Sequence, residues 1–253
     1  MPDGAPDLAR PPGERDVLRH VHEFALQIFD RMCVWAGELD RFTFVHRGAD
    51  ALQALERAAE GGRGAIFLGS HYGSFDMLRS FAGKFRVRVN VVMYTANAPA
   101  INSFFEQLGA GAELGVIAIE PGSPNASFEI RARLERGEVV AILADRAGPA
   151  DGERTVEVPF LGRNARLPRG PFEIALLLRC PVLAATGRRL ADATYEVGVE
   201  PFYDGTPVPR AERDARVRDL AAAFARYLER QCVEDPYQWF NFYDYWEGAG
   251  EKT

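Results

Sequence analysis

The sequence predicts a single α/β domain with a mixed, mostly parallel sheet flanked by helices. From residue 64 onward, short apolar runs alternate with amphipathic segments, a pattern typical of parallel strands joined by crossover helices. The chain has 253 residues, 47% of them hydrophobic, which is enough for one substantial core. No internal repeat, low-complexity block or interdomain linker divides it. We expect residues 1–13, rich in Pro, Gly and Asp, to form a disordered leader and residues 14–253 to form the domain.

Hydrophobic periodicity predicts the individual elements in order. Apolar residues at helical spacing indicate a helix from about residue 17 to 37. A second helix at 50–60 ends at Gly61 and Gly62, which are natural helix terminators. Strands are then expected at 64–69, 87–94, 115–119, 138–144, 156–160, 181–188 and 194–200. Helices are expected at 74–83, 98–109, 126–137, 169–179 and 211–232, followed by an aromatic tail.

Composition and charge narrow the class of protein. The net charge of -6 argues against nucleic acid as the main partner, because phosphate binding generally requires a basic surface. Cys33, Cys180 and Cys232 are widely spaced and include no C-x-x-C pair, so neither a disulfide framework nor a zinc knuckle is indicated. No apolar run approaches the roughly 18 residues of a membrane-spanning helix, and the first residues do not resemble a signal peptide. We therefore expect a cytoplasmic protein, soluble or peripheral to a membrane.

The most informative motif begins where the apolar run at 64–69 ends. His71 would then lie at the carboxyl end of a strand, where open α/β sheets bind ligands. Gly73 and Ser74 suit a tight turn into a helix, which could bring the carboxylate of Asp76 back to the imidazole. A histidine held by a carboxylate is a general base for a hydroxyl or an amine. The alternative is a histidine that caps the helix or packs in the core.

Other catalytic arrangements lack support. No G-x-S-x-G elbow is present, so a serine hydrolase is not indicated. His20, His22 and His46 have no H-x-x-x-H or H-E-x-x-H spacing, and we predict no catalytic metal. Neither a Walker A nor a G-x-G-x-x-G motif occurs, so we predict no cofactor.

A second polar strand end follows the apolar run at 138–144. Asp145 and Arg146 stand there side by side and could face the same crevice as His71, or could form a structural ion pair. Downstream, three arginines could bind a phosphate or carboxylate, or simply solvate a loop. These are Arg163, Arg166 and Arg169.

Residues 237–246, here called the aromatic tail, contain seven aromatic side chains in ten positions. Such a segment could form a membrane-interface belt, the wall of an acyl pocket, or a strap that closes the core. We favour the strap, because aromatic side chains chiefly contribute buried area.

Taken in order, these segments resemble the lysophospholipid acyltransferase superfamily. Its H-x4-D motif is matched by His71 through Asp76, within the segment GSHYGSFD at 69–76. The closer resemblance is to the branch of the late acyltransferases of lipid A biosynthesis, and it runs from about residue 40 to 246. The other matching segments are 89–94 with Asn97, 101–102, 139–146, 153–162, 167–172 and 236–246.

The resemblance implies a glycerolipid acyltransferase-like fold and transfer of a fatty acyl group to a hydroxyl of a lipid or glycolipid. The acyl donor would be a thioester of acyl carrier protein or of coenzyme A. His71 would act as the general base and Asp76 would orient and stabilise its ring. Peripheral contact with the inner membrane of a bacterium is also implied. Positions that would contact substrates are Gly73, Ser74, Tyr94, Asn97, Asp145, Arg146 and Arg169.

The chain departs from its best-known relatives beside the motif. The lipid A branch commonly has Glu at the position of Asp76, and Ser74 and Phe75 replace a frequent Asn-Trp pair. This difference concerns the acceptor rather than the chemistry. Two other functions remain open: a thioesterase in which water replaces the acceptor, and a noncatalytic module that binds acyl chains or acyl carrier protein.

Overall fold

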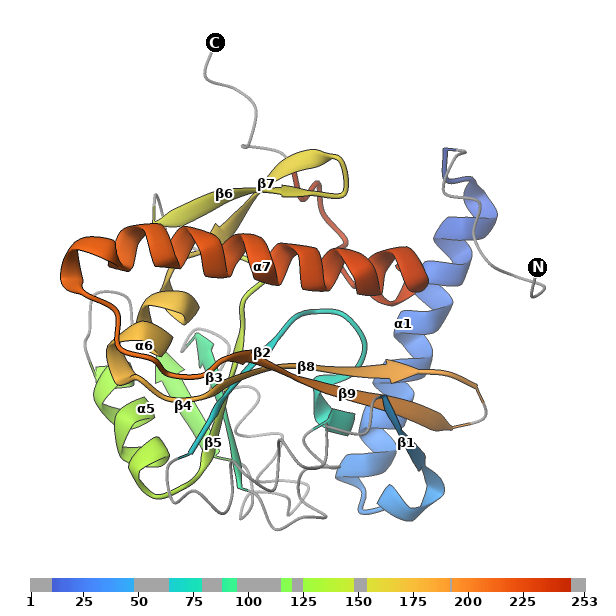
Figure 1. Cartoon of the computed structure of the whole chain (residues 1–253). Helices are drawn as coiled ribbons and strands as arrows, with labels where there is room; N and C mark the ends of the chain where they lie inside the picture. Colours follow the sequence, from blue (N-terminus) through green and yellow to red (C-terminus); the bar gives the residue numbers. More distant parts are fainter. Residues whose placement is uncertain are drawn as a thin grey trace.

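The computed structural model describes residues 11–47, 64–78, 88–94, 115–119, 125–147, 154–191 and 193–246. The helices expected at 50–60 and 98–109, and Asn97, lie outside these ranges. Within them the predicted α/β architecture is confirmed, because a seven-stranded, mostly parallel sheet is flanked by helices (Figure 1). No helix of this described part is long and apolar enough to cross a membrane.

The sheet has the strand order β1-β9-β8-β2-β5-β3-β4. Strands β8 and β9 pair antiparallel and the other neighbours pair in parallel, so the sheet is mixed, as predicted. The strands are β1 (Thr43–Arg47), β2 (Ile66–Gly69), β3 (Val89–Tyr94), β4 (Gly115–Ile119), β5 (Val139–Leu143), β8 (Val182–Arg189) and β9 (Thr194–Tyr203).

Strand β2 is central and is buried on both faces. Ile66 and Leu68 belong to the core that contains residues of α5, α6 and α7, whereas Ala65 and Phe67 belong to the core on the opposite face. Successive side chains of a strand point to opposite faces, so burial of both faces requires an unbroken apolar run. That requirement explains why the sequence before His71 is continuously apolar.

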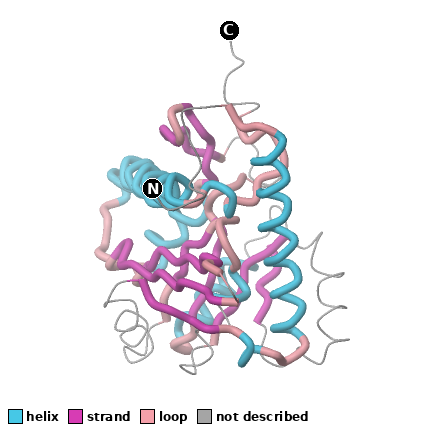
Figure 2. Tube along the Cα trace, turned by 90° about the vertical axis from the view of Figure 1, so that its right-hand side faces the viewer, coloured by secondary structure: helices cyan, strands magenta, loops and turns pink. Residues whose placement is uncertain are grey.

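The helices are α1 (Glu14–Trp35), α5 (Asn125–Glu135), α6 (Gly170–Leu178) and α7 (Arg213–Glu234). Helix α7 lies across one face of the sheet and packs on it through residues such as Phe224 and Leu228 (Figure 1). Helix α1 stands upright beside the strands (Figure 2). Its Asp30 accepts hydrogen bonds from Arg189 and Tyr195 of the sheet. The helix therefore packs on the domain.

The sequence pattern missed two strands, β1 and β7 (Arg163–Pro168). Strand β7 pairs antiparallel with β6 (Thr155–Phe160) across a tight turn in which Leu161 and Gly162 both have positive φ. The prediction of an arginine-rich loop was wrong, because alternate residues of β7 face the core while Arg163 and Arg166 remain exposed. Strand β1 is mostly exposed, so its hydrophobic pattern is weak. Short 3₁₀ turns occur at Leu39–Arg41, Arg210–Glu212 and Pro236–Gln238.

Candidate active site

The ends of two neighbouring strands bring His71 and Asp145 together. In the parallel pairing of β2 with β5, Gly69 lies opposite Leu143. Two residues farther along, His71 and Asp145 again face each other, and Nδ1 of the imidazole lies 2.9 Å from Oδ1 of the carboxylate. The polar ends of these two strands therefore meet at one place, as the strand pattern indicated.

Asp145 is completely buried, and both of its carboxylate oxygens are engaged. Its Oδ2 accepts hydrogen bonds from the backbone N–H of His71 at 3.0 Å and from Nε1 of Trp239 at 3.2 Å. Burial alone would raise the pKa of Asp145, but the charge of His71 and the hydrogen bonds from His71 and Trp239 outweigh it and hold the pKa below its usual value. The carboxylate is therefore ionised in the folded protein near neutral pH.

Asp76 forms an ion pair with helix α1. Its Oδ2 lies 2.7 Å from Nε of Arg31, which projects from α1. Asp76 is in the helical turn 75–78, whose start is capped by Ser74, because Ser74 Oγ accepts a hydrogen bond from the backbone N–H of Met77 at 3.4 Å. The predicted turn into a helix is confirmed, whereas the role of Asp76 as the partner of the imidazole stays a prediction.

Gly73 allows the chain after His71 to dock against β8. Its φ is +68°, and a Cβ at this position would lie 2.2 Å from the carbonyl oxygen of Gly187. The next residue, Ser74, donates its backbone N–H to that same oxygen at 2.7 Å. Only glycine fits such a close approach without moving the backbone. Substrate contacts of Gly73 and Ser74 stay predictions.

The aromatic tail packs against the segments that follow β2 and β5. The backbone N–H of Gly73 donates to Gln238 O at 2.8 Å, and that of Phe240 donates to His71 O at 2.9 Å. The hydroxyl of Tyr245 donates to the carbonyl oxygen of Asp145 at 2.6 Å. The interpretation of this segment as a strap is confirmed, and through Trp239 the strap also touches the buried carboxylate.

Two other side chains that were predicted to contact substrate, those of Arg146 and Arg169, bind groups of the protein itself. Arg146 donates from Nε to Asn241 Oδ1 at 2.5 Å and from its terminal nitrogen to the carbonyl of Phe240. The guanidinium of Arg169 pairs with Glu173 and Asp214. Strand β3 ends at Tyr94 and runs parallel to β5, so this residue lies at the same edge of the sheet as Asp145. All three substrate contacts stay predictions.

Two contributors were not singled out from the sequence. Trp239 belonged to a segment that aromatic content had marked, but nothing local distinguished it from its aromatic neighbours. Arg31 lies at a distance of 45 positions from Asp76 in the chain, and no pattern signals their ion pair. Within the described ranges no group of three or more His, Cys, Asp and Glu side chains is arranged to hold a metal ion.

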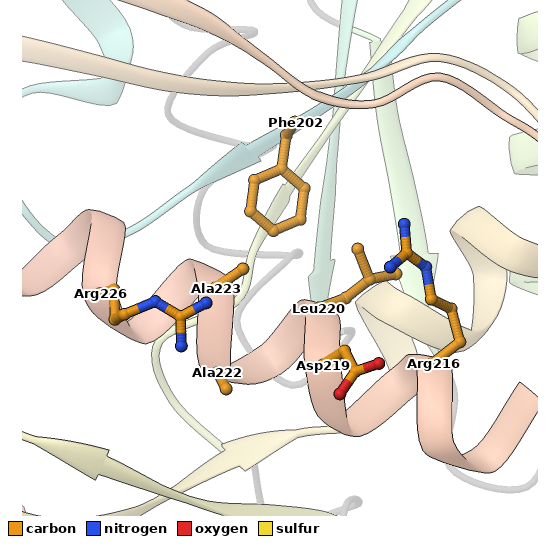
Figure 3. Close-up of a pocket in the computed structure, with 7 residues that line it drawn as sticks. All are labelled: Phe202, Arg216, Asp219, Leu220, Ala222, Ala223 and Arg226. Carbon is orange, nitrogen blue, oxygen red and sulfur yellow. The ribbon is translucent and has the colours of Figure 1, made fainter.

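A pocket of about 380 Å³ lies elsewhere, between α7 and β9. Figure 3 shows Phe202 pointing toward α7, with Arg216 and Arg226 on either side. Small side chains on this part of α7 leave the space open. Neither His71 nor Asp145 lines it, so the pocket is separate from the paired strand ends. Its lining residues are Phe202, Arg216, Asp219, Leu220, Ala222, Ala223 and Arg226.

A partly exposed histidine on a buried carboxylate, at the carboxyl ends of parallel strands, is typical of α/β enzymes that use a general base. The family model for bacterial lipid A biosynthesis acyltransferases matches residues 28–247. The chain therefore belongs to this family, whose members are acyltransferases of lipid biosynthesis, and the resemblance seen in the sequence is confirmed. A search of curated proteins finds none that matches.

Proposed function

We propose that the protein transfers a fatty acyl group from an acyl thioester to a hydroxyl of a lipid or glycolipid, with His71 as the general base. The observation that carries this proposal is the pairing of His71 Nδ1 with the buried Asp145. The side chain of His71 remains 32% exposed, so Nε2 is the nitrogen left for a substrate proton. The family assignment supplies acyl transfer to lipid as the reaction class.

The reaction balances with the residues of this chain. Nε2 of His71 takes the proton of the acceptor hydroxyl, and the acceptor oxygen forms a bond to the thioester carbonyl carbon. Collapse of the tetrahedral intermediate breaks the carbon–sulfur bond. The leaving thiolate then takes the proton from the imidazolium, which gives an ester, a free thiol and the neutral base. No cofactor is required, and acyl carrier protein and coenzyme A are both suitable carriers of the thiol.

Two carboxylates serve His71 in this proposal. Asp145 holds Nδ1, and Asp76 supplies a second negative charge that stabilises the imidazolium formed during the reaction. Asp76 follows the motif histidine by five residues and is itself fixed by Arg31. The acceptor crevice that we propose is formed by Gly73, Ser74, Tyr94, Asn97 and Arg146, with Arg169 as a contact for an anionic group.

Mass spectrometry of lipid extracts tests the function directly. Cells that carry an active copy of the gene are expected to contain a lipid heavier by one acyl chain, and cells with a His71→Ala copy are expected to lack it. The purified protein, given a long-chain acyl thioester and that lipid, should produce the same species. Formation of free fatty acid alone would instead identify a thioesterase. Binding of the thioester without any turnover would identify a noncatalytic module.

We also propose that α1 meets the membrane that holds the lipid acceptor, at the inner face of the cell membrane. The helix faces the domain with Gln27 and Asp30, which are buried. Its other side exposes large apolar side chains, and an exposed apolar surface of this kind typically marks a site of contact with a protein or a membrane. Insertion of apolar side chains, rather than attraction to anionic lipid, suits a chain of net charge -6. The exposed residues are Val17, Leu18, Val21, Phe24, Phe29 and Met32 of α1, with Phe242 and Tyr243 of the aromatic tail.

The double variant Leu18→Asp, Phe29→Asp is expected to bind phosphatidylcholine vesicles at least about tenfold more weakly than the wild type, because each apolar side chain contributes roughly 1.5–3 kcal/mol when it leaves water. Co-sedimentation with the vesicles measures the effect. Phe128→Asp is the matched control: Phe128 is 69% exposed, as Leu18 is, but lies on α5. Equal binding by the double variant and the control would exclude α1 as the contact.

A further inference from the structure

We propose that Trp239 is a positioning residue of the active site, and that the aromatic tail completes the general base by fixing the Asp145 carboxylate against His71. The proposal deepens the function proposed above and rests on His71 as the base. It assigns a specific role to one indole N–H among the seven aromatic residues of the tail.

The two oxygens of Asp145 have separate tasks. Oδ1 lies 2.9 Å from Nδ1 of His71, while Oδ2 accepts two N–H groups. One of these donors is the backbone of His71 itself, and the other is Nε1 of Trp239, which comes from a segment 94 residues away. The contacts other than that of Trp239 both come from His71, one to each oxygen. The indole N–H adds a fixed point outside His71 and keeps Oδ1 directed at the ring.

The position of Trp239 is itself determined by contacts on both sides. Its backbone pairs with Tyr72 in an antiparallel bridge, and the next residue, Phe240, donates its N–H to His71 O. Its ring packs edge-on against Phe160 and Tyr245, with centroids 5.1 and 4.7 Å away. The indole is therefore held by the same segment that carries the imidazole. Docking of the tail therefore places the indole against the carboxylate.

The tail contains a matched comparison for this role. Trp246 also packs on Phe160, with ring centroids 6.4 Å apart, and on Trp239 at 6.3 Å. Its Nε1 is buried but has no hydrogen-bond partner among the residues that the structure describes. Replacing either tryptophan by phenylalanine removes a similar amount of ring. Only at position 239 does the substitution also remove a hydrogen bond to the catalytic carboxylate.

Steady-state kinetics of acyl transfer distinguish positioning from packing. Trp239→Phe is expected to lower kcat about 10-fold to 100-fold with little change in KM, because a hydrogen bond to a charged group is lost at the base and not at the substrate. Trp246→Phe should stay within about twofold of the wild type in kcat. A Trp239→Phe enzyme with the kcat of Trp246→Phe overturns the proposal. Thermal unfolding of both variants checks that each is folded.

A spectroscopic measurement tests the same bond without any turnover. The chain has three tryptophans, so each indole N–H can be assigned in ¹H–¹⁵N spectra through single Trp→Phe variants. Asp145→Asn should move the Trp239 indole resonance and leave that of Trp246 in place. An unmoved Trp239 resonance overturns the proposal. Full activity of His71→Ala would instead refute the proposed function, while the indole shift would still report on the bond between Trp239 and Asp145.

Discussion

His71→Ala is expected to lower kcat for acyl transfer by about 10³-fold or more while leaving the fold intact. The reason is that the variant has no group at the strand end to accept the proton of the acceptor hydroxyl. Among the described residues the imidazole makes one side-chain hydrogen bond, to Asp145, and it remains 32% exposed, so its removal leaves little empty space in the core. Turnover of a long-chain acyl thioester with the lipid acceptor measures the loss.

His46→Ala is the matched control for this substitution. His46 lies on β1 and is exposed, and β9 and β8 separate this strand from β2. We expect it to retain turnover within about twofold of the wild type, as for most surface substitutions. Unchanged turnover by His71→Ala would reject the base mechanism, provided that circular dichroism shows both variants to be folded.

Asp145→Asn is expected to lower kcat by about 10³–10⁴-fold, the scale seen when a carboxylate that orients a catalytic histidine becomes an amide. The mechanism follows from the contacts of Oδ2. Because two N–H groups point at that position, the oxygen of the amide should stay there and its NH₂ group should face Nδ1 of His71. Nδ1 must then accept, which moves the ring proton to Nε2 and blocks the lone pair that the reaction needs.

The tautomer can be observed directly by ¹⁵N spectroscopy at a pH where the ring is neutral. The wild-type ring should carry its proton on Nδ1, because an ionised carboxylate can only accept a hydrogen bond. Asp145→Asn should carry it on Nε2. A wild-type ring protonated on Nε2 would contradict this assignment without the need for any variant. Asp40→Asn, which changes an exposed carboxylate on the Leu39–Arg41 turn, should alter neither the tautomer nor kcat.

The variant Asp76→Asn, studied by the same kinetic and spectroscopic measurements, distinguishes the role of Asp76 from that of Asp145. We expect a loss of at least about tenfold in kcat, since the imidazolium would lose the second negative charge that we propose for it, but no change in the tautomer. A switch of the ring proton to Nε2 in this variant would show that Asp76, and not Asp145, orients the ring. A near-normal rate would show that the ion pair with Arg31 is structural.

The local pattern of apolar residues was sufficient to predict most of the described helices and strands. Strand β4 has the predicted bounds, and both ends of β2, β5 and α7 agree with the prediction to within two residues. Strands β2 and β5 are unbroken apolar runs and α7 has a period of 3.6 residues, and both signals depend only on neighbouring side chains. Strands β1 and β7 were missed because each has little burial on one or both faces, so the period-2 signal is diluted by polar residues.

The sequence by itself determined the α/β class, the placing of His71 and Asp145 at strand ends, and the turn that begins at Gly73. Each follows from a short run of residues. Only the tertiary structure decided which carboxylate meets Nδ1 of His71. Asp145 is 74 residues away, and Trp239 lies a further 94 beyond it. Their meeting depends on the parallel register of β2 with β5 and on the docking of the aromatic tail, and neither is encoded in local spacing, because both arise from packing between segments distant in the chain.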